Sequence, residues 1–367
     1  MTNDQIVRLI KPYIDFQEVE KDFQKIFASG MLTKGEYVQG FREELMDYTK
    51  AKYCFLTTSA TTALTIALKT VNVQPGDEVI VSDFSFPATA NVVEDLGAKP
   101  VFADVDKETF NMRPNELRKK ISNKTKAVIF VDALGNPSGL LEIKEICEQY
   151  EIPLIEDGAC AIGSEISGKK IGNVADLTCF SFHPRKMITT GEGGAILTNQ
   201  SKYADFLDVK LNHGATFSNE RLDFVTYGYN YRLPELQAAM GIVQLKKLDE
   251  IVEHRINMKN RYIEKLTPLG FTPQKIDDNV VHNVQSIVFI VPKEIDRDDL
   301  IEYLRKNNIE TTIGTYCLSN TTYYREKYND IQPVAKFLEE NTITLPCYDG
   351  VPVEEVCEVI RAFFYED

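Results

Sequence analysis

Lys186 is the residue whose surroundings most directly suggest covalent chemistry. It lies in residues 181–194, SFHPRKMITTGEGG, after His183 and just before a turn rich in threonine and glycine. A lysine amine becomes a Schiff-base nucleophile when partial burial or neighbouring cations lower its pKa, and Arg185 and His183 could contribute in this way. The alternative is an ordinary solvated surface lysine, and the local pattern alone fits both.

A third interpretation, a phosphate-binding lysine beside a glycine-rich loop, fails on the order of the residues. The nucleotide-binding pattern places the lysine after the glycines and at the start of a helix. Here Lys186 precedes the glycines, and residues 194–199 are typical of a strand. The dinucleotide-binding pattern G-x-G-x-x-G is absent from the sequence as well.

Asp157 is a second candidate, because it ends the apolar run PLIED. A carboxylate at the end of a buried strand is costly unless it is paired. It could cap the segment that follows. It could also be the fixed anion that keeps a pyridinium nitrogen protonated, which pyridoxal 5′-phosphate (PLP) needs to act as an electron sink. The neighbouring Glu156 points to the opposite face and is the weaker candidate.

Two further stretches could bind a flat, phosphorylated ligand. In residues 56–64, LTTSATTAL, small residues precede a predicted helix, whose first backbone amides form an anion site by geometry and by the helix dipole. Ala60 and Thr61 would hold a phosphate there, although a Ser/Thr N-cap without a ligand explains the pattern equally well. Phe86 follows a predicted strand and could cover a planar ring, or it could be a core residue.

These residues need a scaffold that gathers them, and the hydrophobic pattern predicts one. Short apolar runs alternate with amphipathic stretches, which favours βαβ units and a mostly parallel sheet covered on both faces. Ligands bind beyond the carboxyl ends of the strands in such sheets, so polar residues after strands are where chemistry is expected. The predicted strands span 77–83, 99–106, 126–133, 153–159, 176–182 and 194–199, and the predicted helices span 61–71, 88–97, 113–122 and 140–150.

The last third of the chain has a different pattern. One long helical pattern, residues 234–266, forms a bridge to a smaller α+β unit with a predicted strand at 286–291 and helices at 296–308 and 353–366. We therefore predict a large domain over residues 1–250, with the amino-terminal segment included, and a small domain over residues 251–367.

Composition excludes several classes of function. The chain has 367 residues and a formal net charge of -14, so neither nucleic acid nor an anionic membrane is an expected partner. No secretory signal is visible, and no apolar run is long enough to cross a bilayer. Seven scattered cysteines without a CxxC pair favour reduced thiols in a cytoplasmic protein. The four histidines lack metal-ligand spacing, so no metal site is expected.

Taken in order, these features resemble the DegT/DnrJ/EryC1/StrS aminotransferases, the PLP-dependent sugar aminotransferases of the aspartate aminotransferase fold. The resemblance covers nearly the whole chain. It rests on SGMLTKGEYVQGF (29–41), SATTAL (59–64), PGDEVIVSDFSFPATANVV (75–93), GAKPVFADVD (97–106), GNPSG (135–139), IEDGACAIGS (155–164), SFHPRKMITTGEGGAILTN (181–199) and GYNYRLPELQAAMGIVQL (228–245). It implies an α/β fold of type I, with a large domain built on a mostly parallel mixed sheet and a small α+β carboxyl-terminal domain.

The resemblance also implies roles around the cofactor ring. Lys186 would carry PLP covalently and move protons between the cofactor and substrate carbons. Asp157 would pair with the pyridine nitrogen, and Phe86 would stack on the ring. His183 belongs to the same motif, where it would either support the Lys186 loop or take part in catalysis.

The phosphate ligands implied by the resemblance come from two subunits. Ala60, Thr61 and Ser181 would bind the phosphate of their own subunit's cofactor. Asn230, in the motif GYNYR, would reach the phosphate of the neighbouring subunit's cofactor. The active unit is therefore expected to be a homodimer with shared active sites.

The sequence departs from the family pattern at three places. Cys160 stands where the family usually has Gln or His against the phenolic oxygen of the cofactor, and Asp132 replaces a common His. The pattern Tyr-x-Pro-Leu-His near the sugar becomes TYCLSN, residues 315–320, which keeps Tyr316 alone. These departures leave the cofactor assignment intact but bear on the substrate.

The expected function is transfer of an amino group from L-glutamate to a keto-sugar, through the pyridoxamine phosphate form of the cofactor. The expected acceptor is a nucleotide-linked 3- or 4-keto-6-deoxyhexose used in polysaccharide or amino-sugar biosynthesis. The alternatives are a free keto-sugar or inositol ketone as acceptor, a PLP-dependent sugar dehydratase and a non-catalytic regulator. Related dehydratases have His in place of the lysine, so Lys186 argues against the dehydratase.

Overall fold

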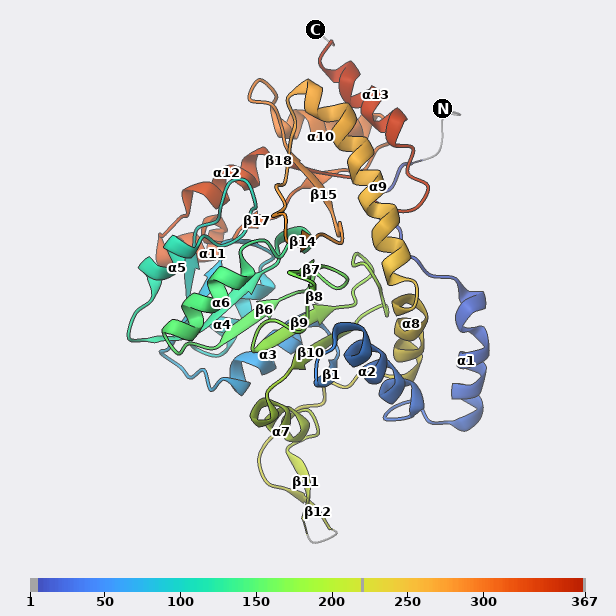
Figure 1. The fold of residues 1–367 in the computed structure, drawn as a ribbon, viewed down its shortest axis with the longest axis vertical. Helices are drawn as coiled ribbons and strands as arrows, with labels where there is room; N and C mark the ends of the chain where they lie inside the picture. Colours follow the sequence, from blue (N-terminus) through green and yellow to red (C-terminus); the bar gives the residue numbers. More distant parts are fainter. Residues whose placement is uncertain (1–5, 219–220, 366–367) are drawn as a thin grey trace.

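A seven-stranded mixed sheet forms the centre of the computed structural model, which describes residues 6–218 and 221–365 (Figure 1). The strand order is β1-β10-β9-β6-β5-β2-β4. Parallel pairs join β9 to β6, β6 to β5, β5 to β2 and β2 to β4, whereas β10 and β1 are antiparallel. The strands span Tyr53–Thr57 (β1), Glu78–Ser82 (β2), Lys99–Ala103 (β4), Thr125–Val131 (β5), Leu154–Asp157 (β6), Leu177–Ser181 (β9) and Gly194–Thr198 (β10).

Helices cover both faces of this sheet, because side chains along each strand alternate between two apolar cores. Val79 and Val81 of β2 pack in the core formed with α3, α4 and α7, and Ile80 packs in the core formed with α2, α5, α6 and α8. The helices span Glu36–Thr49 (α2), Ala60–Thr70 (α3), Ala88–Asp95 (α4), Pro114–Lys120 (α5), Leu140–Gln149 (α6), Ser201–Lys210 (α7) and Glu235–Leu245 (α8). The fold class predicted from the sequence is confirmed.

The predicted elements of the large sheet match the structure apart from their ends. The six predicted strands are β2, β4, β5, β6, β9 and β10, and the four predicted helices are α3, α4, α5 and α6. The sequence analysis missed β1, which pairs antiparallel with β10 at the edge of the sheet. It also missed α1 (Phe16–Ser29), which packs against α8.

The long helix predicted over residues 234–266 is wrong, because the structure divides it into α8 and α9 (Leu248–Leu266). At Lys247 the backbone leaves the helical region, with φ -103° and ψ 0°. The sequence contains the signal for this break: Lys246 and Lys247 complement the carboxyl end of α8, and Asp249 and Glu250 lie in the first turn of α9.

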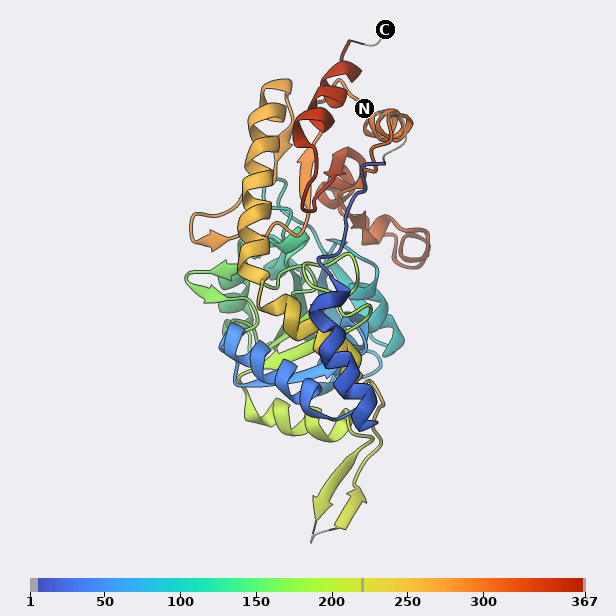
Figure 2. The same ribbon diagram turned by 90° about the vertical axis from the view of Figure 1, so that its right-hand side faces the viewer.

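A four-stranded sheet with the order β13-β15-β18-β16 organises the carboxyl-terminal part. Helices α9, α10 (Arg297–Lys306) and α13 (Val353–Phe363) share an apolar core with this sheet. Figure 2 shows α9 running from the large sheet into this part. The strands span Thr272–Pro273 (β13), Ile287–Ile290 (β15), Thr312–Ile313 (β16) and Thr342–Leu345 (β18). The domain boundary near residue 250 stays a prediction.

The amino-terminal segment pairs with the carboxyl-terminal part, although the prediction placed it in the large domain. Val7 forms a parallel bridge with Ile309, and the Leu9 carbonyl accepts the Cys347 amide at 2.9 Å. Leu9 and Ile10 then line the cavity described below. Residues distant in sequence are thus neighbours at this point.

A short two-stranded sheet of β3 (Phe84–Ser85) and β17 (Tyr316–Cys317) joins the two parts. Asp83 strengthens the joint, since its buried carboxylate accepts the Ser319 amide at 2.7 Å, the Ser319 hydroxyl at 2.6 Å and the Cys317 thiol at 3.1 Å. Burial raises the pKa of Asp83 to about 7, against the opposing effect of the Ser319 hydrogen bonds. This joint fixes residues 315–320 beside the large sheet.

Smaller elements complete the fold, and one of them projects from it. The hairpin of β11 (Ala215–Ser218) and β12 (Arg221–Phe224) extends away from the body of the molecule (Figures 1 and 2). Within the described residues, no helix combines the length and apolarity needed to span a membrane. The remaining elements are β7 (Glu165–Ile166), β8 (Lys169–Lys170), β14 (Val280–Val281), α11 (Thr322–Tyr328), α12 (Pro333–Asn341) and three short 3-10 turns, Ala133–Gly135, Thr267–Leu269 and Leu318–Asn320.

Candidate active site

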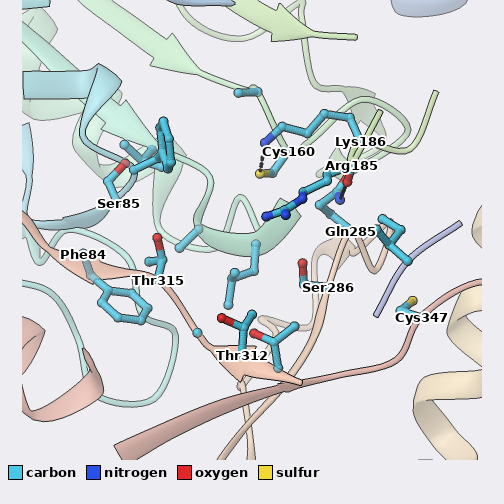
Figure 3. Close-up of a pocket in the computed structure, with 18 of the residues that line it drawn as sticks. Phe84, Ser85, Cys160, Arg185, Lys186, Gln285, Ser286, Thr312, Thr315 and Cys347 are labelled. Atoms are coloured by element: carbon cyan, nitrogen blue, oxygen red, sulfur yellow. Dashed lines mark hydrogen bonds between the residues drawn. The ribbon is translucent and has the colours of Figure 1, made fainter. Parts of the chain in front are cut away.

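A cavity of about 220 Å³ opens at the carboxyl ends of β5 and β6 and continues against the carboxyl-terminal part (Figure 3). This is the edge at which parallel sheets bind ligands. Its polar and charged lining residues are Ser85, Asp157, Cys160, Arg185, Lys186, Gln285, Ser286, Thr312, Thr315, Thr344 and Cys347. The cavity therefore combines residues from both parts of the chain.

Lys186 projects into this cavity from the turn that follows β9. The turn is tight, since the Lys186 amide donates to the His183 carbonyl at 2.8 Å. The next two residues, Met187 and Ile188, are buried and anchor the turn in the core. The half-buried Lys186 amine donates to the Cys160 sulfur at 3.1 Å (Figure 3). The sequence thus places a nucleophilic amine on a fixed backbone, aimed at the end of β6.

Asp157 lines the same cavity and is bonded at both carboxylate oxygens. One oxygen accepts the Thr89 hydroxyl at 2.8 Å, and the other accepts the Ala159 amide at 3.3 Å. The Thr89 hydroxyl has a single hydrogen, which it donates to Asp157. The Ser85 hydroxyl therefore donates to the Thr89 oxygen, with 2.9 Å between the two oxygens. Burial raises the pKa of Asp157, while the Thr89 hydrogen bond and the charge of Lys186 oppose the shift. The sequence analysis missed Thr89.

Glu156 points to the opposite face of the sheet, where it lies near Asp132. Its carboxylate accepts the Thr178 hydroxyl at 2.6 Å. Both oxygens of Asp132 are buried without a hydrogen-bond partner among the described residues. Burial raises the pKa of Glu156 to about 7, and burial and the nearby Glu156 and Asp157 raise the pKa of Asp132 well above its usual value. We therefore expect this pair to hold a proton at neutral pH.

The start of α3 lies beside the ends of β9 and β10. Ser59 caps the helix, since its hydroxyl accepts the Thr62 amide at 3.2 Å. The amides of Ala60 and Thr61 donate to no other group in the described part of the chain. A Cβ on Gly194 would lie 2.5 Å from the Ser59 backbone, so only glycine allows this approach. Two free amides at a helix start form an anion site.

Ser181 lies beside the start of α3, and Phe86 lines the cavity. Ser181 ends β9 and pairs with Gly194, and its buried hydroxyl accepts the His183 amide at 3.4 Å. Phe86 follows β3 and remains 65% exposed. The ring of Tyr316 meets it edge-on, with 6.3 Å between the ring centroids. Phe86 is therefore a cavity residue with an uncovered aromatic surface, rather than a core residue.

His183 and Asn230 are the two remaining candidates. The His183 Nδ1 accepts the Arg185 amide at 3.1 Å, so the ring supports the backbone next to Lys186. Burial lowers the pKa of His183, and Glu192 opposes that shift. Asn230 is exposed. Neither residue is among the described residues that line the cavity, and the candidate phosphate ligands Ala60, Thr61 and Ser181 are not among them either.

The carboxyl-terminal wall of the cavity contains residues that sequence reasoning missed. Gln285 and Ser286 precede β15, and Thr312 and Thr315 flank the end of β16. They are neutral residues in short loops or, for Thr312, in the two-residue strand β16, so no spacing or charge marked them. Tyr316, the residue kept from the family pattern, contacts Phe86, while its neighbour Thr315 lines the cavity.

These groups fit PLP. Lys186 supplies an amine, and Asp157 a buried carboxylate facing the same cavity. Ala60 and Thr61 supply free amides for a phosphate, in a cradle that a Cβ on Gly194 would fill. No cluster of three or more metal-ligating side chains occurs in residues 6–218 and 221–365.

Comparison with known proteins gives a consistent result. Residues 14–364 match the DegT/DnrJ/EryC1/StrS aminotransferase family. GDP-perosamine synthase of Escherichia coli O157:H7 is 31% identical, over 98% of this chain and 98% of that protein. Helicobacter pylori PseC, an aminotransferase of pseudaminic acid biosynthesis, has a TM-score of 0.93 at 26% identity, over 98% and 100% of the two chains. The PLP form of the putative sugar aminotransferase Spr1654 of Streptococcus pneumoniae has a TM-score of 0.88 at 28% identity, over 98% of both chains.

Proposed function

The chain belongs to the DegT/DnrJ/EryC1/StrS aminotransferase family and is a PLP-dependent sugar aminotransferase, and we propose that it transfers an amino group from L-glutamate to a nucleotide-linked keto-sugar. The proposed acceptor is a 3- or 4-keto-6-deoxyhexose, and the product would enter polysaccharide or amino-sugar biosynthesis. GDP-perosamine synthases among the relatives support a nucleotide-linked acceptor. We also propose a cytoplasmic enzyme, in keeping with its seven free cysteines.

One observation carries the assignment of the site: the Lys186 amine and the buried Asp157 carboxylate line the same cavity. Bound PLP supplies an electron sink for the substrate carbon that loses a proton. In the proposed site Asp157 would accept a hydrogen bond from the protonated ring nitrogen. The Thr89 hydroxyl holds the Asp157 carboxylate in the orientation that this contact requires.

Lys186 acts as general base and general acid in the proposed mechanism. With PLP bound, the Lys186 Nζ would take a proton from the substrate carbon and carry it to the neighbouring acceptor carbon. Such a transfer is efficient when the free amine titrates near the working pH. The fixed backbone of the turn and the Cys160 contact aim Nζ into the cavity. Donor and acceptor would use the same site in turn, so ping-pong kinetics are expected.

The remaining cofactor contacts are proposed for residues at the start of α3, at the end of β9 and in the cavity. The amides of Ala60 and Thr61, with the Thr61 and Ser181 hydroxyls, would bind the phosphate, and the uncovered ring of Phe86 would stack on the cofactor. Cys160 takes the place of the usual Gln or His near the phenolic oxygen. Its sulfur is a weak hydrogen-bonding group, so we expect a weaker contact to that oxygen.

We propose a homodimer in which each subunit completes the other's site. The projecting hairpin exposes apolar side chains, among them Phe217 at 77% and Phe224 at 61% exposure, which a partner subunit would cover. Asn230 is exposed close after the hairpin and lies outside its own subunit's cavity. That position suits a residue that reaches the phosphate of the neighbouring subunit's cofactor.

Reduction with borohydride followed by peptide mapping tests the cofactor assignment. Phosphopyridoxyl should appear on Lys186. Its appearance on another lysine, or on none, would overturn the assignment and favour a non-catalytic protein. A screen of keto-sugars and their nucleotide-linked forms, with L-glutamate as donor, tests the substrate. Turnover of free sugars or inositol ketones alone would contradict the nucleotide-linked acceptor, and loss of water without amination would indicate a dehydratase.

A further inference from the structure

The guanidinium of Arg185 lies in the cavity without a protein partner. Arg185 is exposed, and its side chain points toward the centre of the cavity next to Lys186 (Figure 3). Across the described ranges of the chain, no carboxylate pairs with it and no carbonyl accepts its N–H groups. The protein has 55 acidic and 41 basic residues, and many of its surface cations form ion pairs, but Arg185 does not.

The backbone of Arg185 is held on both sides, so the direction of its side chain is constrained. The Arg185 amide donates to His183 Nδ1 at 3.1 Å. The Arg185 carbonyl accepts the Gln285 side-chain amide at 2.6 Å. Gln285 belongs to the carboxyl-terminal wall, and its side chain is buried. These two contacts fix the Arg185 backbone, so the side chain starts from a constrained position at the cavity.

The charges around the cavity leave Arg185 uncompensated. The charged residues that line the cavity are Asp157, Lys186 and Arg185. Asp157 and Lys186 are of opposite charge and are both assigned to the cofactor. The other polar side chains that line the cavity are neutral. A single free cation in a site of an acidic protein attracts an anionic ligand.

We propose that Arg185 binds the α-carboxylate of the amino-acid donor. A guanidinium binds a carboxylate through two parallel hydrogen bonds, and this geometry is specific. The α-carboxylate is attached directly to the carbon that must meet the Lys186 amine, so a cation on the adjacent residue is well placed for it. The diphosphate of a nucleotide-linked sugar is several bonds from the reacting carbon. This inference rests on the proposed use of an amino-acid donor.

The first half-reaction tests this proposal without any sugar. The PLP-loaded enzyme is mixed with L-glutamate alone, and the absorbance of the cofactor is followed as it passes to the pyridoxamine form. Arg185→Ala should raise the half-saturating concentration of L-glutamate about ten- to hundredfold, because a charge-assisted pair is lost. Arg185→Lys should lose less, since it keeps the charge but not the paired geometry.

Donor analogues locate the contact on the α-carboxylate. The wild-type enzyme should discriminate against L-isoglutamine, whose α-carboxylate is an amide, more strongly than against L-glutamine, whose γ-carboxylate is an amide. Arg185→Ala should remove most of the discrimination against L-isoglutamine. An unchanged ratio in the variant would overturn the proposal, because the missing cation would then not be the group that senses the α-carboxylate.

Arg118→Ala is the matched control, because Arg118 is an exposed cation on α5 away from the cavity. It should leave the donor half-reaction unchanged, and the melting temperatures of both variants should stay within about 2 °C of wild type.

A loss confined to the half-reaction with a nucleotide-linked keto-sugar would overturn the proposal and assign Arg185 to the diphosphate. A wild-type enzyme that reacts with L-alanine or L-aspartate but not L-glutamate would correct the donor and keep the proposal. Reaction with no amino acid would overturn both.

Discussion

The two walls of the cavity differ in how their polar groups are bonded. On the sheet wall, formed by the ends of β5 and β6 and the Lys186 turn, Lys186 donates to Cys160 and Asp157 accepts from Thr89. On the carboxyl-terminal wall, the hydroxyls of Ser286 and Thr312 are not bonded to any other residue that the structure describes, and neither is that of Thr315. The two groups assigned to the cofactor are thus bonded within the protein, although Arg185 in the same turn is not. The carboxyl-terminal wall combines these three free hydroxyls with the bonded side chains of Gln285, Thr344 and Cys347.

This difference matches the two kinds of ligand that a transaminase handles. A cofactor that stays in place favours groups whose orientation is fixed in advance, since preorganised partners need no rearrangement during the reaction. Substrates exchange at every turnover, and free hydroxyls can bond whichever substrate is present. We therefore expect substitutions of Lys186 and Asp157 on the sheet wall to affect chemistry. Substitutions of the free hydroxyls on the carboxyl-terminal wall should affect substrate binding, as should substitution of the unpaired Arg185.

The largest effect should come from Lys186→Ala. The variant loses both the covalent attachment and the proton-transfer group, so kcat for transamination should fall by about four orders of magnitude or more. Steady-state assays with L-glutamate and a keto-sugar that the wild-type enzyme aminates measure this loss of kcat. The surface variant Lys119→Ala, on α5, is the control and should match wild type. Residual activity within tenfold of wild type would break the assignment of the sheet wall to chemistry.

Asp157→Asn should have the next largest effect, and Glu156→Gln provides a matched comparison one residue away. Removing one preorganised electrostatic partner of the cofactor should lower kcat about 10²- to 10³-fold. Glu156 lies on the opposite face of the sheet, so its variant should lose less than about tenfold. The kcat values of the two variants, with the absorbance maximum of bound PLP as a second measurement, decide which carboxylate contacts the cofactor. Equal losses of kcat in the two variants would contradict the assignment of Asp157, rather than Glu156, to the cofactor.

On the carboxyl-terminal wall, Thr315→Val should change acceptor binding and leave the donor half-reaction intact. Loss of one neutral hydrogen bond should raise KM for the keto-sugar about three- to tenfold. The melting temperature should stay unchanged, because the Thr315 hydroxyl has no bond to lose within the described protein. A drop in melting temperature together with an unchanged KM would contradict the view of this wall as a substrate surface.

The smallest effect concerns stability and the buried pair behind the sheet wall. The folded-state pKa of Glu156, about 7, lies above its ordinary value, so its contribution to stability is present at low pH and is lost as pH rises through about 7. Asp132→Asn removes the nearby carboxyl and should make the variant more stable than wild type at pH 8, by roughly 1 kcal/mol. Urea unfolding at pH 6 and pH 8 measures this change. A wild-type free energy of unfolding that rises with pH, with no gain in the variant, would contradict the shared proton.

The contrast between the walls also explains what the sequence could predict. Asp157 ends strand β6 and Lys186 lies in the turn after β9, each inside a contiguous motif, so residue type and position together predicted them. The periodicity of the strands gave the large sheet for the same reason, since buried parallel strands are continuous apolar runs. The short edge strand β1 was missed because its five residues run directly into the LTTSATTAL segment.

Residues of the carboxyl-terminal wall could not be found in this way. Gln285 and Thr312 are neutral, and they lie in a short loop and in a two-residue strand, respectively. They reach the cavity only because the two parts of the chain pack together. Thr89 is a threonine in the first turn of α4, and nothing in its local pattern distinguishes a helix residue from a partner of Asp157. These contacts depend on packing between residues far apart in the chain, and no local pattern in a single sequence indicates such packing.

The path of the amino-terminal segment has a practical consequence for protein production. Residues 7–10 run along the carboxyl-terminal sheet and end at the cavity wall, where Leu9 and Ile10 take part in its lining. A purification tag fused at this end, or trimming by a contaminating protease, would act a few residues from the substrate surface. An affinity tag after α13 leaves that wall undisturbed and is the better choice for kinetic work.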